Sequence, residues 1–100
     1  MAIAEVALLP VRRGEDEAFA AAFAEARTFI EGAEGFLGLT MRPRADVDSD
    51  DPFLLIVRWT SVAAHRDGFR GSPAYHRWRA LLHPFYDDVP PVHYVVDRSL

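Results

Sequence analysis

Apolar residues cluster along the chain in a pattern that predicts strands and helices in alternation. The runs that indicate strands are rich in β-branched and aromatic residues, and prolines or polar turns end them. They cover residues 2–9, 36–42, 53–60 and 92–97. The third run, FLLIVRWT, has the strongest strand character.

Between these runs, apolar residues recur at steps of three and four, which is typical of helices with one buried face. The segment 15–31 starts with acidic residues, which are favourable at a helix N-terminus, and carries a phenylalanine-rich face. A short helix is expected over 62–69 after Ser61, and a longer one from Pro73 to about residue 86 after Ser72. Serine caps free N–H groups, and proline suits the first helical turn.

The element order is therefore β-α-β-β-α-α-β, which indicates one α+β domain over residues 1–100, with helices covering one face of an antiparallel sheet. The segments FLLIV and VHYVV are apolar on both faces, and Glu5 is the single polar residue in 2–9. A sheet with one wet face would alternate apolar and polar residues. We therefore expect a homodimer in which the uncovered sheet faces pack together.

Composition excludes several classes of function. The chain has a formal charge of -4 and contains no cysteine, so we expect no nucleic-acid or anionic-membrane partner and no disulfide or thiolate chemistry. Lysine, asparagine and glutamine are also absent, which excludes a lysine Schiff base and a P-loop lysine. No apolar run approaches a membrane span of roughly 18 residues, and the basic pair follows the N-terminal apolar run, opposite to a signal peptide. The simplest expectation is a cytoplasmic protein.

One candidate for chemistry lies on the short helix. His65 shares a stripe with Val62 and Phe69 that faces the sheet, close to Trp59 at the end of a strand. Imidazole titrates near neutral pH, so His65 is suited to accept a proton from a bound aromatic ligand or to donate a hydrogen bond to it. The alternative is a half-buried histidine bonded to a backbone carbonyl.

The longer helix carries a second set of candidates. Its buried stripe serves either as core or as the wall of an aromatic pocket, and consists of Tyr75, Trp78, Leu82 and Phe85. His76 and His83 flank this stripe, and Arg77 points to solvent. Arginines 66, 70, 77 and 79 either recognise an anionic group or balance surface charge.

Asp46, Asp48 and Asp50 imitate the start of a calcium-binding loop. The imitation fails because the sixth position is Asp51 instead of glycine and the twelfth is Val57 instead of glutamate. We predict a solvated loop and no metal site.

Three segments together resemble the antibiotic biosynthesis monooxygenase (ABM) family: EGAEGFLGL after the first helix, FLLIVRWTSVAAH, and GSPAYHRW. The resemblance covers about residues 3–97. It implies a ferredoxin-like fold that dimerises into an α+β barrel. Members include cofactor-free oxygenases of polycyclic phenols and anthrones, heme-degrading enzymes, and small proteins of unknown role.

The resemblance lets the heme-degrading branch be tested by residue type. That branch implies asparagine on the first strand, tryptophan on the short helix and histidine on the next helix. Here these positions fall near Glu5, at Gly68 or Phe69, and at Arg77 or His76. Heme degradation is therefore disfavoured.

The cofactor-free branch makes looser demands, because an electron-rich phenolate can itself pass an electron to oxygen. The protein need only bind, deprotonate and shield the substrate. We expect an oxidoreductase of a small aromatic or quinol-type substrate that uses no metal or other cofactor. His65 or His76 is the candidate base, and Trp59, Phe69 and Tyr75 line the pocket. A non-catalytic ligand-binding dimer is the alternative, and heme binding is a third reading.

Overall fold

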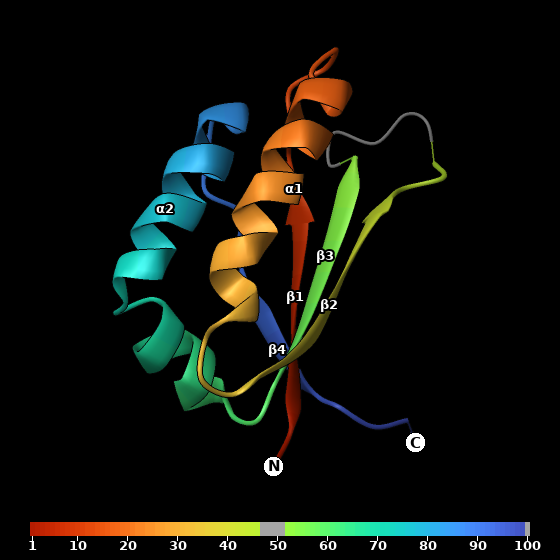
Figure 1. Ribbon diagram of the computed structural model, residues 1–100. Coiled ribbons are helices and arrows are strands. Elements are labelled where there is room, and N and C mark those ends of the chain that lie inside the picture. Colours follow the sequence, from red (N-terminus) through yellow and green to blue (C-terminus); the bar gives the residue numbers. More distant parts are fainter. Residues whose placement is uncertain (47–51, 100) are drawn as a thin grey trace.

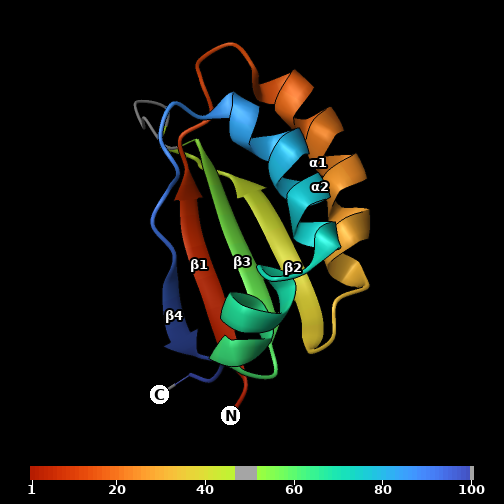
Figure 2. The ribbon, with the colours of Figure 1, turned by 90° about the vertical axis from the view of Figure 1, so that its left-hand side faces the viewer.

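The computed structural model describes residues 1–46 and 52–99, which form two layers (Figure 1). The elements are β1 (Ile3–Leu9), α1 (Asp16–Glu31), β2 (Phe36–Pro43), β3 (Phe53–Trp59), the π-helix η1 (Ala64–Phe69), α2 (Pro73–Leu82), the 3-10 turn η2 (His83–Phe85) and β4 (His93–Val96). Figure 2 shows α1 and α2 on the same side of the sheet. The expected α+β architecture and element order are confirmed.

The sheet has the strand order β2-β3-β1-β4, and all neighbouring strands are antiparallel. This is the ferredoxin-like arrangement. In the register, Glu5 of β1 lies opposite Val57 of β3 on one side and Tyr94 of β4 on the other. Because side chains alternate along a strand, Glu5, Trp59 and Tyr94 share one face. That face is the one that the helices cover.

The core fills the space between this face and the helices. Every second residue of β3 is buried, and the burial continues across β1 and onto one stripe of α1. Phe19 of α1 and Phe53 of β3 have ring centroids 5.0 Å apart, which is within the usual range for aromatic pairs. The largest fully buried side chains are Trp59, Phe19, Ile30, Leu82 and Val57.

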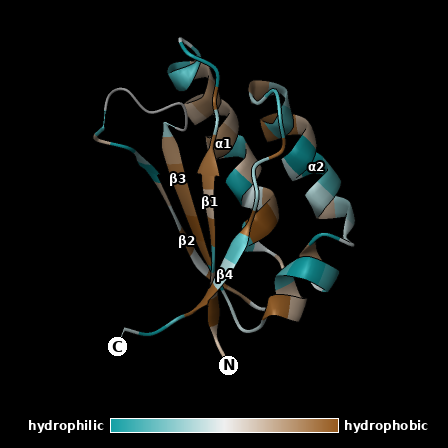
Figure 3. Ribbon diagram, turned by 180° about the vertical axis from the view of Figure 1, so that it is seen from behind, coloured by the Kyte–Doolittle hydropathy of each residue, from teal (hydrophilic) through white to brown (hydrophobic). Residues whose placement is uncertain are grey.

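The opposite sheet face has no described helix over it (Figure 3), and β1, β3 and β4 place apolar side chains on it. Leu8 is 41% exposed and Val95 is 50% exposed, while Leu54 and Ile56 are half-buried. This pattern differs from the alternation expected of a wet sheet face. The homodimer that we expect to cover it stays a prediction.

Two helix predictions need correction. The helix expected from Pro73 to about residue 86 ends at Leu82 and continues only as a 3-10 turn. The cause is Pro84, which has no N–H to continue the α-helical hydrogen bonds. The short helix has the expected extent, but Ala64–Phe69 is a π-helix. The Arg70 N–H therefore donates to the carbonyl of His65, five residues earlier, at 3.0 Å.

Local caps agree with the serine signals. Ser61 Oγ accepts a hydrogen bond from the Ala64 N–H at 3.1 Å, and Ser72 Oγ accepts one from the Tyr75 N–H at 3.3 Å. Gly35 has φ +85° at the entry to β2, and a Cβ there would lie 2.7 Å from the Ala64 Cβ. The α1–β2 turn therefore packs directly under the start of the short helix.

Two further predictions concern a calcium-binding loop and membrane-spanning segments. Most of the calcium-loop imitation falls on residues 47–51, which are outside the described residues. Among residues 1–46 and 52–99, no helix has the length and apolar character needed to span a bilayer.

Candidate active site

Four side chains form a polar cluster on the helix-covered face of the sheet: buried Glu5, Trp59 and His65, and half-buried Tyr94. The Trp59 Nε1–H donates to Glu5 Oε1 at 2.9 Å. His65 Nε2 lies 3.4 Å from the same carboxylate oxygen, and His65 Nδ1 lies 2.7 Å from the Tyr94 hydroxyl. Glu5 is 5% exposed and His65 is 3% exposed. A carboxyl group and an imidazole thus meet inside the protein.

Strand register and the π-helix bring this cluster together. Glu5 and Tyr94 are cross-strand neighbours, and Trp59 ends the strand on the other side of β1. The π-helix follows that strand after a short turn, and it turns His65 and Phe69 into the core. The His65 ring centroid is 5.4 Å from that of Trp59 and 5.7 Å from that of Tyr94. The expectation that His65 faces the sheet near Trp59 is confirmed.

Burial controls the charge of the cluster. Desolvation raises the pKa of Glu5, although the Trp59 hydrogen bond and the Arg70 charge act in the opposite direction. Desolvation, together with a smaller contribution from the Arg70 charge, lowers the pKa of His65 to about 4. Both effects disfavour a charged group in a place with little water. At neutral pH His65 is therefore a neutral imidazole, able to accept a proton.

The contacts of a neutral His65 select its tautomer. Neutral imidazole has one N–H and one acceptor nitrogen. With the N–H on Nε2, it points to the Glu5 carboxyl, and Nδ1 accepts the hydrogen bond of the Tyr94 hydroxyl. This arrangement satisfies both contacts. The three side chains form a chain of polar contacts. Glu5 orients His65, and His65 accepts a hydrogen bond from the Tyr94 hydroxyl. Burial raises the pKa of Tyr94, so its hydroxyl keeps that proton at neutral pH.

A cavity of about 60 Å³ adjoins the cluster. Its lining residues come from the sheet, the end of the π-helix, α2 and the segment before β4: Glu5, Ala7, Leu9, Leu55, His65, Arg70, Tyr75, Trp78, His83, Tyr86, Val89, Pro90 and Val92. Glu5 and His65 are buried, whereas Arg70 and Val89 are exposed. The cavity therefore runs from a buried acid–base pair to a rim that reaches solvent.

A wider groove of about 490 Å³ lies between the end of α1, the π-helix and the start of α2. It contains no histidine, and its lining residues are Thr28, Phe29, Gly32, Ala33, Glu34, Gly68, Phe69, Ser72, Pro73 and Ala74. Phe69 separates this groove from the cluster, since its ring centroid lies 5.7 Å from that of Trp59 and 5.5 Å from that of Tyr75. Although the groove is larger, the groups that can do acid–base chemistry line the smaller cavity.

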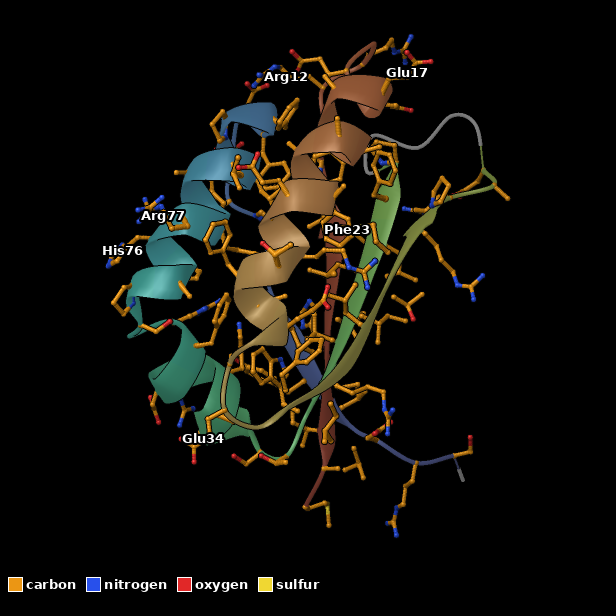
Figure 4. All side chains as sticks on the ribbon, viewed as in Figure 1. Arg12, Glu17, Phe23, Glu34, His76 and Arg77 are labelled. Carbon is orange, nitrogen blue, oxygen red and sulfur yellow. The ribbon has the colours of Figure 1, made fainter. Side chains whose placement is uncertain are left out.

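The five residues predicted from sequence occupy different positions. His65 and Tyr75 line the cavity. Trp59 is fully buried beneath it, and Phe69 is 2% exposed and borders the wider groove. His76 is exposed on the side of α2 that points away from the sheet, as is Arg77 (Figure 4). The structure therefore brings four of the predicted residues together and leaves His76 outside.

Glu5 and Tyr94 were not assigned to the site from the sequence, and Arg70 and His83 were named only as open candidates, among four arginines and on the flank of the aromatic stripe. Glu5 had a signal, because it is the only polar residue in an otherwise apolar strand. Tyr94 had none, since tyrosine is common in strands. His83 lines the cavity, and burial lowers its pKa with help from Arg79 and Arg70. The alternative for His65 was a half-buried histidine bonded to a backbone carbonyl. The structure instead shows a buried histidine that is hydrogen-bonded to the Tyr94 hydroxyl.

The residues present do not fit heme. His76, the candidate heme ligand, is exposed outside the cavity, and both ring nitrogens of His65 within it already face Glu5 and Tyr94. Within the part of the chain that the structure describes, no group of three or more His, Asp or Glu side chains is arranged to hold a metal ion.

Comparison with known proteins shows the family and the shared fold. The family model described as antibiotic biosynthesis monooxygenase matches residues 2–81. The uncharacterized protein YczJ of Bacillus subtilis (strain 168) is 35% identical over 95 residues, covering 95% of this chain and 98% of that protein. A crystal structure from Bordetella bronchiseptica, described as a candidate antibiotic biosynthesis monooxygenase, superposes with TM-score 0.89 at 28% identity, covering 99% and 98% of the two chains. SnoaB of Streptomyces nogalater, a cofactor-independent oxygenase, superposes with TM-score 0.80 at 20% identity, covering 99% and 95%.

Proposed function

The chain belongs to the antibiotic biosynthesis monooxygenase family, and from this premise we propose that it is a cofactor-independent monooxygenase of a small phenolic or quinol-type substrate. The observation that carries the proposal is His65, a neutral buried base held between Glu5 and the Tyr94 hydroxyl. The described fold of SnoaB supports it, because a cofactor-independent oxygenase is built on the same scaffold.

In the proposed reaction, His65 accepts the phenol proton, either directly or through Tyr94. The phenolate gives one electron to dioxygen, and the two radicals combine to form a C–O bond at an ortho or para carbon that carries hydrogen. The proton that His65 accepted then protonates the peroxide. The O–O bond of this hydroperoxide then breaks with loss of water, and a quinone carbonyl remains. One oxygen atom enters the product and the other leaves as water. All four electrons come from the substrate, so the balance requires no other reductant.

The protein supplies binding, a proton acceptor and exclusion of water, and these roles match the described residues. Tyr75 gives the cavity an aromatic wall, while Trp59 and Phe69 pack behind the cluster and fix its geometry. A cavity of about 60 Å³ is too small for an aromatic ring. Substrate binding therefore displaces Val89 and Pro90 at the rim, in the connection between η2 and β4.

Aerobic oxygen uptake with a panel of phenols, hydroquinones and anthrones tests the proposal. We expect His65→Gln to lower kcat by about a hundredfold or more, the usual contribution of a general base. His76→Gln should retain activity, because this side chain lies outside the cavity. The reverse pattern would transfer the role to His76, and equal activity in both variants would remove the assigned base. Uptake with no member of the panel would contradict the monooxygenase itself.

A non-catalytic ligand-binding protein is the second candidate function. The groove beside Phe69 favours it, since about 490 Å³ of largely apolar space lies away from the acid–base cluster. A compound that raises the Tm and is recovered unchanged under air would support binding without chemistry. Loss of that shift in Ala74→Trp, which fills the groove, would place the compound there.

We also propose that two copies pack through their open sheet faces. The support is the exposed apolar surface of Leu8 and Val95, beside half-buried Ile56. Light scattering should report a dimer for the native chain and a monomer for Leu8→Glu. Ala21→Glu adds the same charge at an exposed position on α1 and should remain dimeric. A monomeric native chain at micromolar concentration would refute this interface.

A further inference from the structure

Arg70 occupies a distinctive position at the end of the π-helix. In a π-helix each turn is wide enough for hydrogen bonds between residues five apart, so residue i+5 lies nearly above residue i. The Arg70 N–H to His65 carbonyl bond, 3.0 Å, is of this kind. In an α-helix, residue i+5 would point well away from residue i. The π geometry thus brings Arg70 to the same side as His65, and both line the cavity.

The Arg70 guanidinium has no protein partner there. Within residues 1–46 and 52–99 it makes no ion pair and no side-chain hydrogen bond. Its neighbour Arg66 pairs with Asp67 at 3.6 Å, as expected of surface charge balance. Arg77 is also exposed, but it points away from the sheet and lines no part of the cavity. Arg70 is therefore a cation at the rim of a cavity that contains the proposed base.

The field of Arg70 reaches the interior of the site. The Arg70 charge opposes the rise that burial causes in the pKa of Glu5 and Tyr94, and it adds to the fall that burial causes in the pKa of His65 and His83. Glu5 and Arg70 line the same cavity, yet they do not form an ion pair. The space between the acidic floor and the basic rim is the cavity itself. A ligand bound in this space, and not a protein carboxylate, is therefore positioned to pair with the Arg70 guanidinium.

We propose that Arg70 is a substrate-binding residue and that the substrate is an aromatic hydroxy compound carrying a carboxylate. The phenolic hydroxyl lies toward His65 and Tyr94, and the carboxylate pairs with Arg70. Guanidinium binds carboxylate through two parallel N–H···O bonds, which fix orientation as well as affinity. This inference rests on the proposed monooxygenase function, because it assigns the substrate class of the same cavity.

Binding without turnover provides the test. Calorimetry under anaerobic conditions would compare 2,5-dihydroxybenzoate and 1,4-dihydroxy-2-naphthoate with their methyl esters, which keep the ring and lose the charge. We expect the native chain to bind at least one acid about tenfold or more tightly than its ester, as a charge-assisted pair implies. Arg70→Gln should abolish this preference and Arg70→Lys should keep part of it. Arg77→Gln is the matched control and should leave it unchanged.

The outcomes separate this inference from the proposed function. Equal affinity for acid and ester, no binding of either acid at millimolar concentration, or a preference that survives in Arg70→Gln would each overturn the anion subsite. Oxygen uptake with the esters, together with equal affinity for acid and ester, would overturn the anion subsite and leave the monooxygenase proposal standing. An Arg70-dependent preference for the acid with no oxygen uptake would sustain the subsite and contradict the oxygenase.

Discussion

Replacing His65 with glutamine should change how the stability of the protein depends on pH. Glutamine keeps polar atoms near Glu5 and Tyr94 but does not titrate. In the native chain the pKa of His65 falls from 6.5 in the unfolded state to about 4 in the folded state. The unfolded chain therefore binds more protons than the folded chain between these values, and the free energy of unfolding decreases as the pH falls through that window.

The size of this effect follows from the shift. Each pKa unit corresponds to about 1.4 kcal/mol, so the full penalty below pH 4 is about 3 kcal/mol. Between pH 7 and pH 5 it amounts to about 2 kcal/mol. Glu5 acts in the opposite sense: its raised pKa removes stability as the pH rises above 4.5 toward the folded value. Both proteins retain Glu5, so its contribution cancels to first order in their difference.

Urea unfolding at several pH values between 5 and 7.5 measures this difference. The free energy of unfolding of the native chain, minus that of His65→Gln, should fall by about 2 kcal/mol from pH 7 to pH 5. The same comparison in a Glu5→Gln background tests whether the carboxyl alters the result. A difference that stays flat would show that His65 titrates normally. A difference that grows as the pH falls would show an imidazolium–carboxylate pair, and the neutral base would be refuted.

Three further substitutions probe the scaffold of the site by urea unfolding. Trp59→Phe leaves the buried Glu5 carboxyl without its indole donor and should cost about 1–3 kcal/mol, so unchanged stability would show that the 2.9 Å hydrogen bond is dispensable. Gly71→Ala places a Cβ 2.7 Å from a backbone carbonyl oxygen of the π-helix and should cost about 1–3 kcal/mol. The control Gly32→Ala, with nothing within 4 Å, should be close to neutral. Similar values for the two variants would show that this close contact does not constrain residue 71. Ser72→Ala removes the N-cap of α2 and should cost about 0.5–2 kcal/mol, and a null result would assign that cap no stabilising role.

Much of the fold follows from local patterns in the sequence. Hydrophobic periodicity predicted each strand and helix within a few residues, and Ser61 and Ser72 marked helix starts that the structure confirms. These features depend on neighbours within one turn of the chain, so a linear pattern carries them. The error at the end of α2 has the same local origin, because Pro84 lacks the N–H that an α-helix would need at that position.

The candidate site was only partly predictable. The helical stripe correctly placed His65 toward the sheet near Trp59, but the same reasoning on α2 could not separate His76, which is exposed, from the cavity wall formed by Tyr75. A residue on the border of a buried stripe points inward or outward according to how its helix is rotated against the sheet. Packing determines that rotation, and the sequence pattern does not.

The sequence by itself determined the element order, the buried face of each helix and the chemical repertoire, which lacks cysteine, lysine and amide side chains. Tertiary structure alone decided that Glu5, His65 and Tyr94 meet, because strand register places Tyr94 beside Glu5 and helix packing brings His65, 29 residues before Tyr94, against both. It also decided the charge of His65, since desolvation depends on what surrounds a side chain in three dimensions. The π-helix that turns Arg70 toward the same cavity was also visible only in the tertiary structure, because the apolar pattern of 62–69 does not distinguish a π-helix from an α-helix.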